Sequence, residues 1–265
     1  MPSYLRHRLD QDRVALSLSY PLLLSTTRSL VLGGDVYGSD QHDSYFNRIN
    51  GARLVLQTDV RVLHSELDYT QASTTQVRKL GLGIGQGFDA WGAQSRALTN
   101  IAGASLGSPS DVRFTRYNLN ASQSDRWGAH VGTVLSLAGQ YSRDHLPSTE
   151  QISFGGPRYG LAYDPGSISG DSGWGAALEV NRPFAYGATW LKALVPYAVA
   201  QQARVYLNGS RPQLDTLQSM ALGLRLSDNR HYTVDVSAAQ PLGELPANQR
   251  HREPRYGLSF SYQLR

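Results

Sequence analysis

The sequence predicts an all-β fold, an antiparallel outer-membrane β-barrel. Three observations predict it: apolar and polar residues alternate along most of the chain, short and long connections alternate between the predicted strands, and no stretch approaches the ~18 consecutive apolar residues of a membrane helix. The mean hydropathy of -0.36 suits such a barrel, because its strands average apolar outer positions with polar inner ones.

Period-two alternation is clearest near the end of the chain. There Leu258, Phe260 and Tyr262 share one face, while Ser259 and Ser261 share the other. Such a strand is apolar on one side and wet on the other, as a barrel wall requires. The pattern predicts eleven strands, near residues 14–20, 28–37, 54–70, 77–88, 111–121, 127–141, 174–181, 191–207, 217–226, 232–239 and 255–264.

The connections between these strands alternate in length. They are predicted to be short after residues 20, 70 and 121 and long after residues 37, 88 and 141. Short periplasmic turns that alternate with long extracellular loops are typical of outer-membrane barrels, whereas a soluble sandwich shows no such rhythm. Because bacterial single-chain barrels have even strand numbers, an odd count that begins outside the cell predicts that upstream strands are absent. The first residues also lack the apolar core of a signal peptide.

Composition excludes several classes of function. The chain has no Cys, which excludes a disulfide framework, a thiolate metal site and a thiol nucleophile. Its formal net charge of +4 comes from scattered cations without a Lys/Arg run, so a solvated surface or a barrel lumen is favoured over a nucleic-acid site. No Ser/His/Asp arrangement rises above chance, which argues against an outer-membrane hydrolase.

Two local patterns resemble chemical sites. His64, Glu66 and Asp68 alternate on one strand face, as the groups of a metal site or an acid/base pair would, but polar residues of this kind also line a wet barrel lumen. We favour the lumen interpretation. The run GLGIGQG at 81–87 superficially matches a phosphate loop, yet no helix follows it. Its glycines share the lumen face, which predicts room for an inward-folded loop or for main chain passing through the pore.

The most specific signal is the run at 140–174, QYSRDHLPSTEQISFGGPRYGLAYDPGSISGDSGW. Its motif positions are, in order, Gln140, Leu146-Pro147-Ser148, Glu150-Gln151, Gly155-Gly156, Ala162-Tyr163 and Ser169-Gly170-Asp171-Ser172-Gly173. This run resembles the long sixth extracellular loop, with the strand ends on either side of it, of the two-partner secretion transporters, the haemolysin secretion/activation family. Fragments at 18–23, 85–93, 195–206 and 238–243 agree with the same family, so the resemblance spans residues 14 to 265.

The resemblance implies an architecture. Six predicted strands precede the long loop and five follow it, which matches strands six to sixteen of a sixteen-strand barrel. We therefore expect a partial barrel, with about 11 of 16 strands. Residues 1–265 are then the C-terminal transporter β-barrel domain, and the N-terminal strands, the plug helix and the periplasmic receptor (POTRA) domains are expected to be absent.

The resemblance also implies a site, in which the tip of the long loop docks on a strand inside the lumen. The family's tip Arg falls at Leu161, and its partner pattern falls at Val199, Gln201 and Ala203, so neutral residues replace both charged members. Arg158 lies near Leu161 but can offer Gln201 only a charge-dipole hydrogen bond. Two interpretations of Ser169-Gly170-Asp171 stay open: it is a simple turn, or, as the resemblance implies, it forms the base of the loop, where Asp171 accepts main-chain N–H bonds that fix the loop's return. The expected loop residues are Gly155, Gly156, Arg158, Leu161, Ala162, Tyr163, Ser169, Gly170 and Asp171.

The function implied is translocation and activation of a secreted haemolysin-like or adhesin-like exoprotein across the bacterial outer membrane, or a truncated remnant with reduced or no activity. A passive diffusion porin is the alternative. Neither function needs an enzyme activity, a cofactor or a metal. The expected partners are the exoprotein, outer-membrane lipid and the barrel-assembly machinery, and no nucleic acid.

Overall fold

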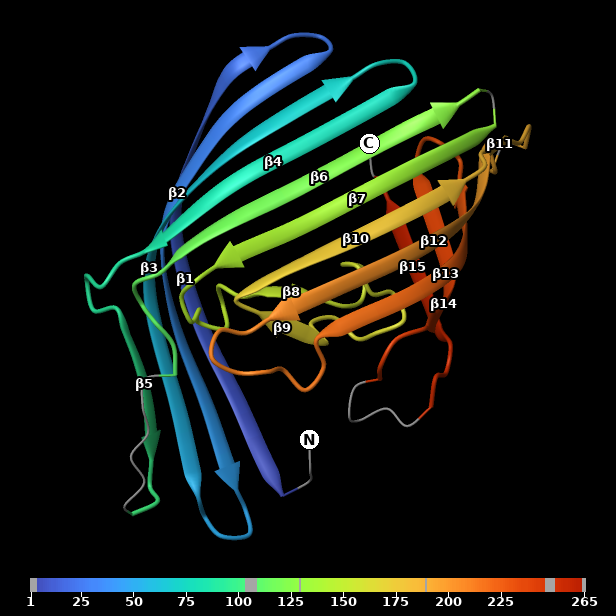
Figure 1. Ribbon diagram of the computed structural model, residues 1–265. Helices are drawn as coiled ribbons and strands as arrows, with labels where there is room; N and C mark the ends of the chain where they lie inside the picture. Colours follow the sequence, from blue (N-terminus) through green and yellow to red (C-terminus); the bar gives the residue numbers. More distant parts are fainter. Residues whose placement is uncertain (1–3, 103–108, 129, 189, 246–250, 264–265) are drawn as a thin grey trace.

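The structure is a single antiparallel sheet curved into a wall. This computed structural model describes residues 4–102, 109–128, 130–188, 190–245 and 251–263. Within these ranges, eleven strands follow one another in the order β1-β2-β3-β4-β6-β7-β10-β12-β13-β14-β15. Figure 1 shows the curved wall with a small hairpin, β8–β9, on its concave side.

The bounds of the strands are as follows. The wall contains β1 (Leu5–Leu24), β2 (Arg28–Asn47), β3 (Arg53–Ala72), β4 (Gln76–Gly87), β6 (Thr115–Trp127), β7 (Val131–Ser142), β10 (Ser172–Asn181), β12 (Ala193–Tyr206), β13 (Thr216–Ser227), β14 (Tyr232–Pro241) and β15 (Arg255–Tyr262). Off this path lie β5 (Gln94–Thr99), which pairs with β3, and β11 (Phe184–Ala185), which pairs with β12. The hairpin is made of β8 (Ile152–Phe154) and β9 (Ile168–Gly170).

Each predicted strand corresponds to one strand of the wall, six before the long loop and five after it. The predicted boundary between β6 and β7 is wrong, because Trp127 ends β6 rather than beginning β7, which starts at Val131. Gly128 has a φ of 60°, which suits a tight turn there. Residues 122–126 are all polar, so this part of β6 has no apolar outer face and resembles a turn in the sequence. Residue 264, the predicted end of the last strand, lies outside the described residues.

The long loop predicted after residue 37 is wrong. β2 continues to Asn47 and pairs with β3 from Arg53 onward, so only a short turn joins these two strands. β1 accompanies them from Leu5, and β5 adds a further strand beside β3. Both faces of this extension carry mostly polar side chains, including the buried Ser39 and Gln41, so the ladder persists while the alternation of apolar and polar residues fades. The alternation of apolar and polar residues therefore predicts only the part of these strands that has an apolar face.

The register separates an apolar outer face from a polar inner face. On the outer face, Tyr117, Tyr141, Trp174 and Tyr206 form an aromatic row across β6, β7, β10 and β12, and each is at least 40% exposed. Trp127 lies ten residues from Tyr117 on β6, a rise of about 34 Å along the strand or about 24 Å at a tilt of ~45°. Aromatic residues flank an apolar band ~25 Å tall in outer-membrane barrels, and these two levels have that spacing, although Gln123 and Asp125 also face outward between them. Among the described residues, no helix is long and apolar enough to cross a bilayer.

The sheet is open along two edges within the described part of the chain. β1 pairs only with β2, and β15 pairs only with β14. Leu258 is 75% exposed and Phe260 65%, so the apolar face of the last strand points outward rather than into a dry core. The prediction of an antiparallel, partial outer-membrane β-barrel fold is confirmed.

Neighbouring residues on β6 test this orientation. Leu119 faces outward and Asn120 lines the lumen. We expect Leu119→Arg to destabilise the folded protein in lipid vesicles by about 1–2 kcal/mol, because an arginine on the lipid face enters hydrocarbon, here close to the aromatic level at Tyr117. Asn120→Arg should cost less than about 1 kcal/mol. Urea titration of vesicle-inserted protein measures both values, and equal costs would contradict the assigned faces.

Candidate functional site

The candidate site is the long connection from β7 to β10, residues 143–171, which folds into the lumen. It carries the β8–β9 hairpin, whose register pairs Ile152 with Gly170 and Phe154 with Ile168. The two hairpin strands lie against β12, and β8 also lies against β10. Figure 1 shows the hairpin enclosed by the curved wall. A segment that does not belong to the wall therefore occupies part of the lumen, which would otherwise be filled with water.

The hairpin turns tightly at two glycines, Gly155 and Gly156. Their φ angles are 126° and 61°, in the region that L side chains rarely adopt. A Cβ on Gly155 would overlap the carbonyl oxygen of Asp164, and a Cβ on Gly156 would lie 2.9 Å from Pro165 Cγ. The Gly155 N–H donates to the Arg158 carbonyl at 2.9 Å, and the Gly156 N–H donates to the Tyr163 carbonyl at 3.0 Å. These bonds hold the tip as a compact unit.

The tip contacts the wall through its main chain at Leu161. The Leu161 N–H donates to Oε1 of Gln201 on β12 at 2.8 Å. The Ser219 hydroxyl on β13 donates to the same oxygen at 3.1 Å and orients the amide. Val199 and Ala203, the neighbours of Gln201 on the lumen face, are 8% and 0% exposed. The sequence-predicted tip and docking residues are thus brought together, and a neutral hydrogen bond joins them.

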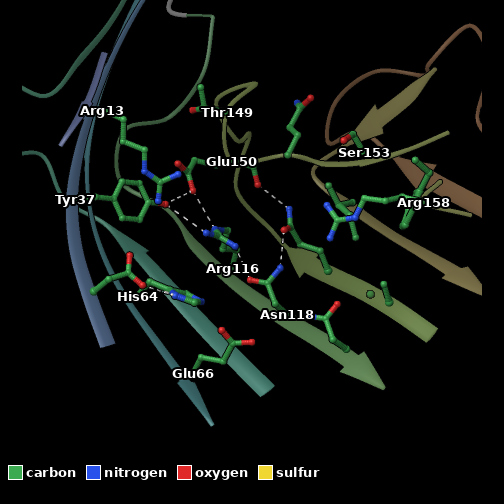
Figure 2. Close-up of a pocket in the computed structure, with 18 residues that line it drawn as sticks. Arg13, Tyr37, His64, Glu66, Arg116, Asn118, Thr149, Glu150, Ser153 and Arg158 are labelled. Atoms are coloured by element: carbon green, nitrogen blue, oxygen red, sulfur yellow. Dashed lines mark hydrogen bonds and ion pairs between the residues drawn. The ribbon is translucent and has the colours of Figure 1, made fainter. Parts of the chain in front are cut away.

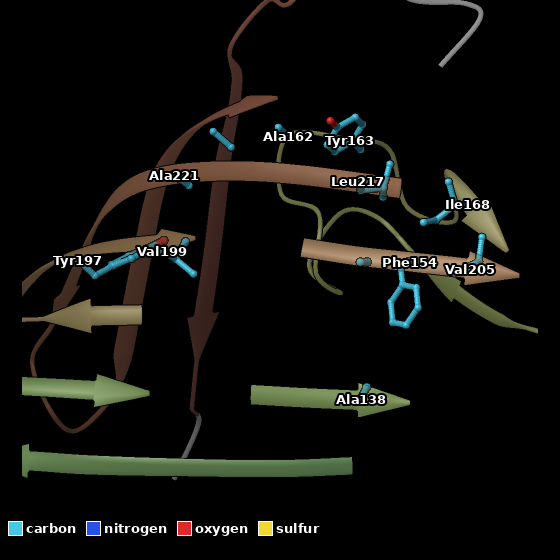
Figure 3. Packing of buried hydrophobic residues seen from close by; sticks show 12 residues of the cluster. Ala138, Phe154, Ala162, Tyr163, Ile168, Tyr197, Val199, Val205, Leu217 and Ala221 are labelled. Atoms are coloured by element: carbon cyan, nitrogen blue, oxygen red, sulfur yellow. The ribbon is translucent and has the colours of Figure 1, made fainter. Parts of the chain in front are cut away.

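Apolar packing surrounds this contact. Ala162 and Tyr163 are buried against the lumen faces of β12 and β13, and Figure 3 shows Tyr163 beside Leu217 and Ile168. The Tyr163 hydroxyl donates to the Gln218 carbonyl at 3.1 Å, so its polar end is satisfied. Burial raises the pKa of Tyr163 above its ordinary value. The remaining buried members of this cluster are Ala138, Phe154, Tyr197, Val199, Ala203, Val205, Ala221 and Ala239.

Asp171 fixes the base of the hairpin from a fully buried position. Its Oδ1 accepts the Leu146 N–H at 2.9 Å and the Gln151 side-chain N–H at 3.2 Å. Its Oδ2 accepts the Asn208 N–H at 2.8 Å and lies 3.5 Å from Nδ1 of His145. One carboxylate therefore joins the start of the loop, its return and the next connection at 207–215. Ser169 lies on the exposed side of β9, and Gly170 passes so close to Tyr206 that a Cβ would lie 2.6 Å from its carbonyl oxygen.

The other side of the loop meets polar wall residues, shown in Figure 2. Oε2 of Glu150 accepts the Tyr37 hydroxyl at 2.6 Å and Nε–H of Arg116 at 3.1 Å. The Gln140 side chain on β7 donates to the carbonyls of Glu150 at 2.9 Å and Asp171 at 3.2 Å. On this side the loop therefore meets hydrogen-bonding wall residues, and Leu146 of the loop also joins a small buried apolar cluster, whereas the other side of the loop meets mainly apolar residues.

Arg158 does not replace the expected tip cation. Its guanidinium makes no hydrogen bond or ion pair with another described residue, and Gln201 is occupied by Leu161 and Ser219 instead. Arg158 lines two cavities, of about 330 and 620 Å³, which also share the wall residues Asn120 and Ala138. The hairpin therefore does not fill the described part of the lumen.

The two other sequence patterns belong to the lumen wall. His64 Nδ1 lies 3.0 Å from Asp35 Oδ1, and no group of three metal-ligating side chains occurs in the described ranges. The row of glycines on β4 does leave space on the lumen face. Side chains of the neighbouring strands fill this space, and the loop does not. A Cβ on Gly83 would lie 3.0 Å from His64 Nε2, and one on Gly85 would lie 3.0 Å from Arg116 Nε.

Sequence reasoning missed Tyr37 and Arg116, which contact the loop from strands far away along the chain. It also missed Leu217 and Asn208. Glu150 belongs to the motif at 140–174, but its partner Arg116 lies on another strand, outside that motif. Once the register of β6 is known, its even-numbered residues face the lumen, and Arg116 is then a candidate partner.

Residues 10–226 match the model of the family described as "Haemolysin secretion/activation protein ShlB/FhaC/HecB". The chain belongs to the haemolysin secretion/activation family. No curated protein sequence matched.

Two solved structures of similar fold are CdiB proteins. CdiB from Escherichia coli aligns with a TM-score of 0.75 at 18% identity, over 97% of this chain and 46% of that chain. CdiB from Acinetobacter baumannii aligns with a TM-score of 0.66 at 15% identity, over 97% and 43%. The chain therefore spans less than half the length of either structure.

Asp171→Ala tests the base of the hairpin in this family member. We expect it to lower the free energy of unfolding by about 3 kcal/mol, because three N–H donors lose their acceptor inside the protein. Trypsin should then cleave more readily after Arg143. Asp164→Ala is the matched control, since that carboxylate lies in the same loop and only forms an exposed pair with Arg255. Similar losses in both variants would contradict the assigned role of Asp171.

A charge-restoring pair tests the neutral tip contact. We expect Leu161→Arg and Gln201→Asp each to weaken docking of the hairpin, because each places one unpaired charge against apolar residues. The double variant should recover about 1–3 kcal/mol relative to the sum of the single variants. A double-mutant cycle on the free energy of unfolding measures this coupling. Simple additivity would show that the two side chains do not meet.

Proposed function

We propose that this chain forms the wall and the gating hairpin of an outer-membrane transporter that moves a secreted haemolysin-like or adhesin-like exoprotein in two-partner secretion. In this proposal residues 1–265 are the C-terminal barrel domain. The observation that carries the proposal is the β8–β9 hairpin, which is docked inside the lumen by Gln201 at its tip and Asp171 at its base. Membership of a secretion/activation family supports the same function.

The contacts of the hairpin suggest how it moves. The tip bonds to the wall through the neutral pair Leu161 and Gln201 and through buried apolar side chains, whereas the base is held by a carboxylate with several donors. Charge-assisted hydrogen bonds are roughly twice as strong as neutral ones. The tip is therefore the end that leaves first, and the base acts as its hinge. An unfolded exoprotein then passes in extended form along the wall, without nucleotide or covalent chemistry.

A covalent tether at the tip tests the proposal. The chain has no Cys, so only the introduced cysteines react with the cross-linking reagent. Leu161→Cys and Gln201→Cys are combined and bridged with a short bis-maleimide in cells that also produce a haemolysin-like exoprotein. We expect the bridge to reduce secretion at least about tenfold, because a bridged tip cannot leave the lumen. Each single-cysteine variant, treated with the same reagent, is the control.

Two outcomes would contradict the proposal. Undiminished secretion by the bridged protein would show that the hairpin stays in place during transport. Uptake of small solutes without any secretion by the unmodified protein would favour the passive porin instead.

A further inference from the structure

The wall contains a preformed site for one carboxylate group. Arg116 on β6 and Tyr37 on β2 both donate to Oε2 of Glu150, at 3.1 and 2.6 Å. Arg116 also donates to the Asn118 side chain at 2.6 Å and to the Tyr37 hydroxyl at 3.3 Å, so its guanidinium is oriented independently of the loop. The Arg13 guanidinium lies 3.9 Å from the centre of the Tyr37 ring and brings a second cation to the same place.

The donors and the acceptor come from different parts of the structure. Arg13, Tyr37 and Arg116 belong to wall strands, whereas Glu150 belongs to the loop that enters the lumen. The side chains of Arg116 and Glu150 are only 16% and 3% exposed, so the pair is largely shielded from water. Figure 2 shows these side chains pointing toward one another. All four line the cavity of about 330 Å³.

We propose that Glu150 is an internal ligand of this site, and that the site binds carboxylate side chains of the passing polypeptide once the loop has moved. This inference rests on the proposed function for the identity of the occupant. When Glu150 leaves, two arginines and a phenol donor remain on the wall without the carboxylate that Arg116 and Tyr37 bond in this structure. An Asp or Glu side chain in an extended chain offers the same group as Glu150 and satisfies the same donors.

The surroundings favour a single carboxylate over a more highly charged anion. The same cavity is lined by Glu66 and by the pair of Asp35 with His64. These acidic groups offset part of the positive charge, so a group with one negative charge is matched best. Acidic segments of an exoprotein would thus pause at the wall strands β1, β2 and β6, on the opposite side of the hairpin from its apolar dock.

Glu150→Ala vacates the site and tests the inference. The probe is a fluorescent deca-glutamate peptide, with deca-glutamine as the uncharged probe, and binding to the purified full chain is measured by anisotropy. Glu66→Ala is the matched control, because it removes one negative charge from the same cavity without vacating the site. We expect Glu150→Ala to bind deca-glutamate at least about tenfold more tightly than Glu66→Ala does. Adding Arg116→Gln to Glu150→Ala should remove this gain.

Several outcomes would overturn the inference. Equal affinity in Glu150→Ala and Glu66→Ala would show that only the net charge of the lumen matters, and a gain that survives Arg116→Gln would place the peptide elsewhere. Should Glu150→Ala fail a gel-mobility test for a folded barrel, Glu150→Gln gives the same comparison with a smaller gain. Because binding is measured without secretion, a failed tethering experiment and a failed peptide experiment are distinguishable.

Discussion

Main-chain hydrogen bonding along one uninterrupted antiparallel ladder is the constraint on which this structure depends. In hydrocarbon an unpaired N–H or C=O costs several kcal/mol, so each strand must be bonded to the next. Once the ladder exists, side chains can only point outward or inward, and a slip by one residue would reverse every one of them. Leu119 and Asn120 show the result on β6, where an apolar side chain and an amide side chain are adjacent in sequence but point to opposite faces of the sheet.

The inner face of the wall has two chemical characters, and the hairpin matches both. β2, β3 and β6 present Tyr37, His64 and Asn118 to the lumen, whereas β12 and β13 present the apolar residues Val199 and Leu217. An apolar patch in a wet lumen is unfavourable when bare, and burying one large apolar side chain recovers ~1.5–3 kcal/mol. Covering that patch therefore drives the hairpin inward. The polar contacts on the other side then determine how the hairpin is oriented.

The fold could be predicted from the sequence wherever one face of a strand is apolar. All eleven wall strands carry such a stretch, whereas the continuation of β2 to Asn47 has no apolar face and could not be distinguished from a loop. The positions of Leu161 and Gln201 came from their alignment with a motif. The hydrogen bond between them could not be predicted in this way, because it joins the main-chain N–H of Leu161 to the side chain of Gln201, and neither residue type indicates such a bond. Tyr37 lies 113 residues from Glu150, and only the curvature of the sheet brings them together.

The neutral contact at the tip has a consequence for how the protein responds to ionic strength. Exposed charges are screened beyond a Debye length of ~8 Å at physiological conditions, and apolar contacts are not weakened in this way. A tip held by Leu161, Tyr163 and an amide therefore stays docked in brine. The Arg116–Glu150 contact is hardly screened either, because its two side chains are only 16% and 3% exposed and its atoms lie 3.1 Å apart. High salinity weakens only exposed pairs of the loop such as Arg255–Asp164 and leaves both sides of the hairpin attached.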